Sequence, residues 1–177
     1  MPIYLGAEGP KNVALAAEIA DGWFPIFLSP KTDAANRAAL AEGFARPGAR
    51  RSASDFEVAL ALAVVPLDDI EAAADLVRPT LALYIGGMGA RTMNFHYEVF
   101  ARMGYEAECA KIQQAYLAGN KREAIAAVPT KLCEEVYLIG SPGKIKDDIA
   151  AWNETCVTTL LVGGPPPLLE MMARMVP

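Results

Sequence analysis

The stretch that decides the fold is IYLGAEGPKNVALAAEIADG, which runs from Ile3 to Gly22. Its apolar start, residues 3–5, is prone to form a β-strand, and the turn-forming residues 6–10 cannot continue that strand. From Lys11 to Ala20, apolar residues recur at helical spacing, and Gly22 stands where a C-terminal cap is expected. The stretch therefore predicts one strand, one loop and one helix in this order.

The same order recurs along the rest of the chain. Residues 23–28 (WFPIFL) and 56–65 (FEVALALAVV) are predicted strands, and each is followed by a predicted helix, at about 32–44 and 70–78. Nearly all residues from about 80 to 140 are expected to be helix or turn, which makes them a long insertion. A helix beginning at Ser141, a strand over 157–162 and a short helix over 168–175 complete the pattern.

Strands that alternate with helices imply an α/β fold with parallel pairing. Two architectures fit, an open doubly wound sheet and part of a (β/α)₈ barrel. A complete barrel takes eight such units and about 250 residues. With four units, this chain corresponds to half of a barrel, with the helical insertion before the last strand, and we expect residues 1–177 to form a single domain.

Composition excludes several classes of protein. With 53% hydrophobic and 21% charged residues, the 177-residue chain is not intrinsically disordered. Its net charge of −5 argues against a nucleic-acid partner. We expect neither a membrane span nor a signal peptide, and the three widely spaced cysteines fit reduced thiols, so the expected location is cytoplasmic.

The loop after the first predicted strand is the strongest candidate site. It stands before a helix N-terminus, where backbone N–H groups and the helix dipole can hold a phosphate. The pattern matches neither the dinucleotide-binding nor the Walker A motif, so from these residues alone a plain strand-to-helix turn is the favoured interpretation. The candidate residues are Gly6, Ala7, Glu8, Gly9, Pro10, Lys11 and Asn12, with amide donors at Glu8, Gly9, Lys11 or Asn12.

A structural role is the favoured interpretation of the other candidate sites. The glycines at 163–164, and those at 86–89 beside Arg91, could hold phosphate or form a lid, but a structural turn is the favoured interpretation of both. His96 has no metal-ligand partner at suitable spacing, and we expect no metal site. The pair Glu134 and Glu135 is interpreted as solvated surface, and no hydrolase triad is present.

Several of these segments together resemble the luciferase-like monooxygenase superfamily, in particular its oxidoreductases dependent on the deazaflavin coenzyme F-420. The similarity covers nearly the whole chain and keeps the family's order of motifs. The motifs are IYLGAEGPK at 3–11, AEIADGW at 17–23, LALYIGGMG at 81–89, GYE at 104–106, GSP at 140–142 and VTTLLV at 157–162.

This resemblance implies a TIM barrel, of which the chain would be the C-terminal half, strands five to eight. It implies that backbone amides at Glu8 and Gly9 grip the cofactor phosphate, with Lys11 adjacent, and that Ser29 and Lys31 border the substrate side. The implied chemistry is hydride transfer between the deazaflavin and a small organic substrate, and an FMN-dependent monooxygenase is the alternative. The resemblance identifies no catalytic side chain.

Half a barrel would leave strand edges and apolar faces exposed. We therefore expect the chain to form a homo-oligomer or to bind a complementing N-terminal half-barrel. A non-catalytic half-barrel fragment, or a module whose main property is oligomerisation, is the competing interpretation.

Overall fold

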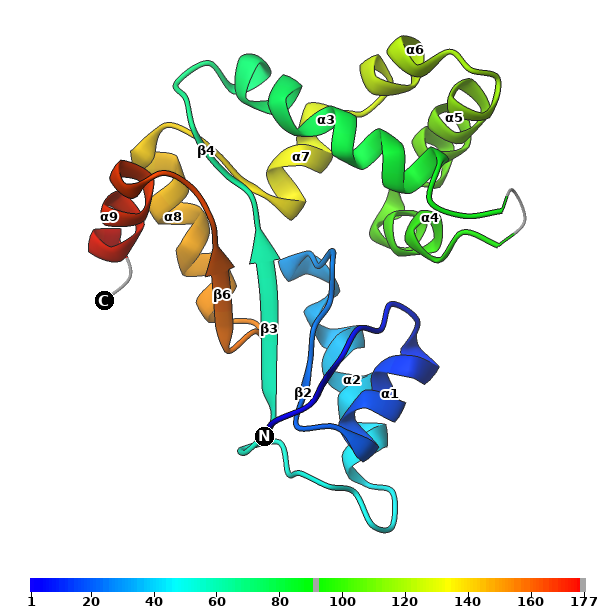
Figure 1. Ribbon diagram of the computed structural model, residues 1–177, viewed down its shortest axis with the longest axis vertical. Helices are drawn as coiled ribbons and strands as arrows, with labels where there is room; N and C mark the ends of the chain where they lie inside the picture. The colour runs from blue at the N-terminus through cyan, green and yellow to red at the C-terminus, as the bar shows by residue number, and fades with distance from the viewer. Residues whose placement is uncertain (91–92, 176–177) are drawn as a thin grey trace. The chain divides into compact units, whose positions relative to one another are not determined.

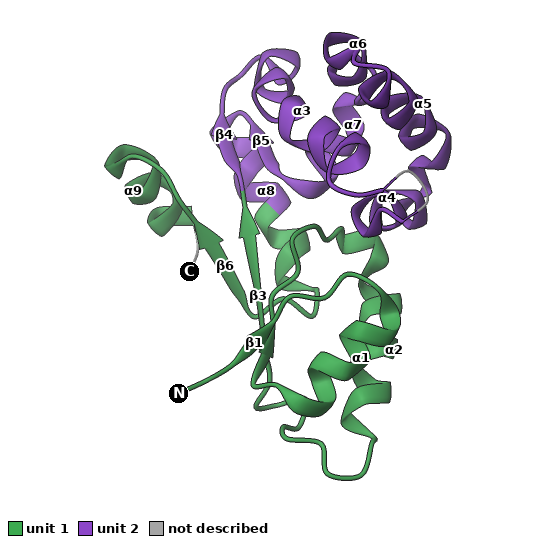
Figure 2. Ribbon diagram, turned by 45° about the vertical axis from the view of Figure 1, so that its right-hand side comes forward, with its two compact units in different colours: residues 1–62, 149–177 green, residues 63–148 purple. Residues whose placement is uncertain are grey.

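The computed structural model describes residues 1–90 and 93–175, which form two compact units. Unit 1 contains residues 1–62 together with 149–177, and unit 2 contains residues 63–148 (Figure 2). The two units are described in turn.

Unit 1 is built on a parallel sheet of four strands within its described residues. The strands β1 (Tyr4–Leu5), β2 (Gly22–Trp23), β3 (Glu57–Leu62) and β6 (Thr159–Val162) pair in the order β1-β2-β3-β6, and all pairs are parallel (Figure 1). The helix α1 (Pro10–Ile19) connects β1 to β2, and α2 (Asp33–Phe44) lies between β2 and β3 in the chain. The predicted α/β fold with parallel strands is confirmed.

The two crossover helices pack closely because both offer small residues at their contact. Val13, Ala14, Ala16 and Ala17 form the buried face of α1. A Cβ atom added at Gly43 of α2 would lie 2.0 Å from the carbonyl oxygen of Ala14, so only glycine fits there. Figure 1 shows α1 and α2 side by side, next to β2.

The second strand is much shorter than the sequence predicts. It ends at Trp23, although the apolar run continues to Leu28. Pro25 has no N–H group for a strand ladder, and the N–H of Ile26 donates to the Glu8 carboxylate instead of a neighbouring strand. Phe27 and Leu28 are nevertheless buried, so the run indicates burial, not strand. Gly22 also departs from its predicted role, since it begins β2 and Ala20 caps α1.

The longest predicted strand divides at Ala63. Its first part is β3, and its second part, β4 (Val64–Pro66), belongs to unit 2 and pairs in parallel with β5 (Leu138–Gly140). Strand β5 was missed in the sequence because its three residues follow a helix with almost no loop between them.

Unit 2 is mainly helical, and β4 and β5 are its strands within the described residues. The helix α3 runs over Ile70–Gly86 and so continues eight residues beyond its predicted end at Arg78, with Pro79 inside it. A proline normally interrupts a helix because it lacks the N–H donor. Here Leu81, Ala82 and Ile85 are fully buried, and their packing maintains the helix beyond the proline.

The remaining elements follow in chain order. They are α4 (Phe95–Phe100), the π-helical segment η2 (Ala101–Tyr105), α5 (Glu106–Leu117), α6 (Lys121–Ala126), α7 (Thr130–Val136), α8 (Pro142–Asn153) and α9 (Pro166–Met175). Ser141 accepts the N–H of Lys144 at 3.3 Å, which confirms the predicted serine cap. The last helix, α9, starts two residues earlier than predicted.

Candidate functional site

The candidate loop connects β1 to α1 and ends in an extended residue. Gly9 precedes the helix with φ −99° and ψ 151°, and Pro10 is the first helical residue, where its missing N–H costs nothing. The carbonyl oxygen of Gly9 accepts the N–H groups of Asn12 and Val13, both at 2.9 Å. The Asn12 amide is thus used inside the helix, although the sequence made it a candidate donor.

Two backbone amides in this loop remain available to a ligand. Among the described residues, 1–90 and 93–175, no acceptor pairs with the N–H of Gly9 or with that of Lys11. Both lie at the positive end of the dipole of the ten-residue helix α1. The Lys11 side chain is exposed, and a Cβ atom added at Gly9 would meet nothing within 4 Å, so the approach to these amides is open.

The loop is fixed by hydrogen bonds from the end of β2 and from the residue that follows it. The N–H of Phe24 donates to the carbonyl oxygen of Leu5 at 2.9 Å, which extends the pairing of the strands. The buried Trp23 indole donates to the carbonyl oxygen of Ala7 at 2.8 Å. A rigid loop holds its amides in place before a ligand arrives, which reduces the cost of binding.

The residues predicted on the substrate side lie in the loop after β2. Ser29 is buried, and its hydroxyl accepts the N–H of Lys31 at 3.2 Å, which caps the short 3₁₀ helix η1 (Pro30–Thr32). The Lys31 side chain is exposed. Because β1 and β2 are neighbouring parallel strands, their following loops lie at the same edge of the sheet, where α/β proteins bind ligands.

The other glycine-rich loops have structural explanations. A Cβ atom at Gly86 would lie 2.4 Å from Cβ of Tyr116, so this glycine allows the end of α3 to approach α5. Arg91, the cation of that candidate, lies outside the described residues. At the other loop, the N–H groups of Leu168 and Leu169 donate to the carbonyl oxygen of Pro165, which begins α9.

The cysteines are not suited to nucleophilic catalysis. All three are free, and burial raises the pKa of Cys109, Cys133 and Cys156 to about 12, so they remain thiols at neutral pH.

His96 packs edge-on against Tyr84, with 4.7 Å between ring centroids, and burial lowers its pKa. Within residues 1–90 and 93–175, no group of three or more His, Cys, Asp or Glu side chains could hold a metal ion.

Two polar features were missed in the sequence. Glu135, interpreted there as solvated, is buried and accepts a hydrogen bond of 3.0 Å from the Tyr105 hydroxyl. On one face of the sheet, the hydroxyls of Tyr4 and Thr159 both donate to the Glu57 carboxylate, which lowers the pKa of Glu57. Tyr4, Thr159 and Glu57 are the first residues of β1, β6 and β3. Once the register of the strands is known, the alternation of side chains along each strand places these three on the same face of the sheet.

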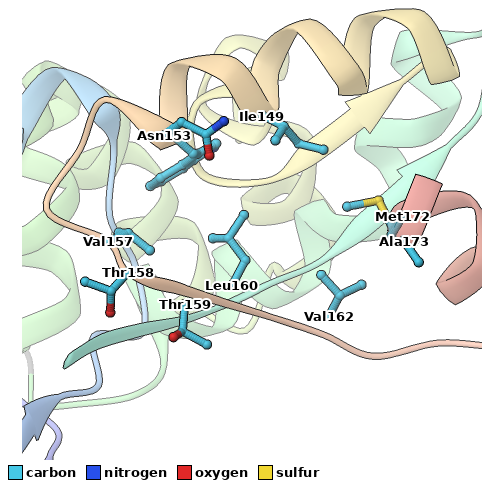
Figure 3. Close-up of a pocket in the computed structure, with 10 residues that line it drawn as sticks. Ile149, Asn153, Val157, Thr158, Thr159, Leu160, Val162, Met172 and Ala173 are labelled. Atoms are coloured by element: carbon cyan, nitrogen blue, oxygen red, sulfur yellow. The ribbon is translucent and has the colours of Figure 1, made fainter. Parts of the chain in front are cut away.

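A pocket of about 290 Å³ lies in unit 1 over β6 (Figure 3). Leu160 and Val162 point into it, and Met172 of α9 helps to close it. Trp152 of α8 also lines the pocket. None of its lining side chains titrates, so the pocket offers no acid or base. Its lining includes no residue of the candidate loop.

The sequence profile of one protein family, described as luciferase-like monooxygenase, matches residues 1–159. The chain belongs to this family. The predicted resemblance is thereby confirmed.

Two curated relatives cover almost the whole chain. The chain is 47% identical, over 92% of its own length, to a Mycobacterium tuberculosis protein whose name assigns it provisionally to the coenzyme F-420-dependent oxidoreductases. It is 25% identical, over 93% of its length, to the 5,10-methylenetetrahydromethanopterin reductase of Archaeoglobus fulgidus. The alignments cover 47% and 48% of these relatives, so the chain spans about half their length.

A solved structure supports the fold independently. The coenzyme F-420-dependent tetrahydromethanopterin reductase of Methanopyrus kandleri matches with a TM-score of 0.72 at 23% identity, over 99% of this chain and 50% of that one. An F-420-dependent secondary alcohol dehydrogenase matches with a TM-score of 0.65 at 17% identity. The chain thus has the fold of half of a TIM-barrel-like reductase.

Among the described residues, no helix has both the length and the apolar character needed to cross a bilayer.

Proposed function

We propose that the chain forms the cofactor-phosphate half of a coenzyme F-420-dependent oxidoreductase that acts on a small organic substrate. The observation that carries the proposal is the pair of unpaired amides, at Gly9 and Lys11, in the loop at the N-terminus of α1. The similarity to a relative and to two solved structures whose names include this coenzyme supports it.

The residues present fit a phosphate group. Two free N–H donors, the helix dipole and the Lys11 ammonium all favour an anion, and the absence of a side chain at Gly9 allows close approach. Hydrogen bonds from Trp23 and Phe24 hold the loop in position before binding. A bound deazaflavin would supply two-electron hydride chemistry, and this half of the protein would contribute binding and orientation.

The substrate side is proposed at the loop after β2. Lys31 places an exposed side chain on this loop, and the Ser29 hydroxyl caps η1. The three free cysteines support a reducing compartment such as the cytoplasm.

We also propose that another polypeptide covers one face of the sheet. Strands β1 and β6 each have a single partner within the described chain, so the sheet ends in two edges. Leu161 is 44% exposed and Tyr4 37% exposed, and both lie on the same face as the Glu57 carboxylate. A second copy of the chain or a complementing half-barrel would bury this surface. The same surface is what supports the alternative of a non-catalytic, oligomerising module.

A matched pair of variants at Gly9 tests the proposed phosphate loop. Gly9→Pro removes the amide donor, and Gly9→Ala keeps it, because φ is −99° and the added Cβ meets nothing within 4 Å. We expect Gly9→Pro to weaken coenzyme F-420 binding about tenfold to a hundredfold, and Gly9→Ala to bind within about twofold of the wild type. Fluorescence titration of the coenzyme measures all three affinities. Equal affinities for the wild type and Gly9→Pro would show that the loop does not hold the phosphate, and tighter binding of FMN than of F-420 would favour the monooxygenase alternative.

A further inference from the structure

The Glu8 side chain connects the two candidate loops. Its Oε1 atom accepts the backbone N–H of Ile26 at 3.0 Å. Ile26 lies in the loop after β2, which also contains Ser29. Glu8 is adjacent in sequence to Gly9, whose free amide is proposed to bind phosphate. A single carboxylate therefore joins the loop proposed for the cofactor to the segment proposed for the substrate side.

The Glu8 carboxylate is electrostatically unfavourable for the binding of an anion at Gly9. Glu8 lies one residue from the amide that would receive an anion, and like charges repel. A negative charge there weakens phosphate binding unless its side chain contributes something that offsets the repulsion. The contact that Glu8 makes with Ile26 supplies an acceptor for an amide that no neighbouring strand pairs, because β2 ends at Trp23.

We infer that Glu8 is a positioning residue, which holds the Gly9 amide in its binding orientation by accepting the N–H of Ile26. The inference rests on the proposed function and deepens it. The part of Glu8 that matters is the oxygen acceptor and not the negative charge. Loss of the acceptor frees the loop to move, and ordering it again on binding costs affinity.

Three variants separate these roles. Glu8→Ala removes both the acceptor and the charge, whereas Glu8→Gln keeps an oxygen acceptor and removes only the charge. Glu42→Ala is the matched control, because Glu42 lies on α2 and pairs with Arg46 at 2.7 Å. Coenzyme F-420 is titrated into each protein while its fluorescence is followed. Hydrogen exchange of the Ile26 amide, followed by NMR, reports on the hydrogen bond itself.

We expect Glu8→Ala to bind coenzyme F-420 about tenfold more weakly than the wild type. We expect Glu8→Gln to bind as tightly as the wild type or more tightly, and Glu42→Ala to match the wild type. The Ile26 amide should exchange slowly in the wild type and in Glu8→Gln, and faster in Glu8→Ala. Because the exchange measurement needs no ligand, it tests the contact even where binding is weak.

Different outcomes overturn different statements. A wild-type chain that does not bind coenzyme F-420 overturns the proposed function together with this inference. A wild type that binds, with Glu8→Ala binding equally well, overturns the inference alone. Equal losses in Glu8→Ala and Glu8→Gln also overturn it, since the charge would then be the important property. If Glu8→Ala does not fold, Glu8→Gln alone tests the inference. The inference is then overturned if the Ile26 amide of Glu8→Gln exchanges as fast as it does in the unfolded chain.

Discussion

The indole Nε1 of Trp23 donates a hydrogen bond of 2.8 Å to the carbonyl oxygen of Ala7. Trp23 is 1% exposed, and Ala7 is buried too, so this bond is made away from water. It joins the end of β2 to the middle of the loop that follows β1. The loop proposed to bind phosphate is therefore held by the core of unit 1 on one side and open to a ligand at Gly9 on the other.

Replacement of Trp23 by Phe should reduce the free energy of unfolding by about 2 kcal/mol or more. The phenyl ring retains part of the buried apolar surface, but the carbonyl of Ala7 loses its buried donor, a loss of about 1–3 kcal/mol by itself. Urea denaturation followed by circular dichroism measures the change. Trp152→Phe is the control for ring size, because the buried Trp152 indole makes no hydrogen bond among the described residues. Equal losses in the two variants would show that the bond to Ala7 contributes nothing.

The free energy of unfolding should fall in acid because the Asp21 carboxylate becomes protonated. Hydrogen bonds from the Ile3 amide, Arg50 and Arg51 lower the pKa of Asp21 from 3.8 to about 2. A carboxyl whose pKa is lower in the folded state stabilises the fold above its unfolded pKa, and that contribution is lost as pH falls through the folded value. The difference in stability between the wild type and Asp21→Asn should therefore be constant near neutral pH and shrink between about pH 4 and 2. A difference that does not change over this range would contradict the assignment.

Gly86 should not tolerate a methyl group. The added Cβ would lie 2.4 Å from Cβ of Tyr116, so Gly86→Ala should reduce the free energy of unfolding by about 1–3 kcal/mol despite the better helix propensity of alanine. Gly143→Ala is the matched control on α8, where nothing lies within 4 Å of the added Cβ. That control should be neutral or stabilise by up to about 1 kcal/mol. Thermal denaturation of both variants tests the pair, and a stable Gly86→Ala would contradict the close approach of α3 and α5.

Association through the sheet should depend on Leu161. A charge at this exposed position on β6 would have to be buried by a second copy, so Leu161→Glu should shift an oligomer towards the 18.9 kDa chain. Leu76→Glu, on α3 and 66% exposed, should leave the mass unchanged. Light scattering coupled to size exclusion measures both masses. A wild type of 18.9 kDa would contradict self-association and leave a complementing half-barrel as the proposed partner.

The regular parts of the fold could be predicted from the sequence, and the short or irregular ones could not. The alternation of apolar strands with helices predicted the parallel sheet, because periodicity directly reflects which faces are buried. The same signal failed at Phe27 and Leu28, which are buried without being in a strand, and at β5, where three residues are too few to show a pattern. Pro79 predicted a helix end that tertiary packing overrides.

The candidate loop illustrates what the sequence could not supply. Its glycine, proline and lysine predicted a strand-to-helix turn, but which amides remain unpaired depends on where acceptors such as the Gly9 carbonyl lie. The contact between Glu8 and Ile26 joins residues 18 apart and has no local signal. The Glu57 cluster likewise depends on the register of three strands.

The measurement that tests the central claim most directly is size exclusion of the chain with and without coenzyme F-420, with the coenzyme's absorbance recorded across the protein peak. The account predicts that the absorbance co-elutes with a protein peak of defined mass and that Gly9→Pro reduces it strongly, whereas Gly9→Ala retains it. A well-folded protein peak without coenzyme absorbance, at coenzyme concentrations that saturate full-length relatives, would contradict the account.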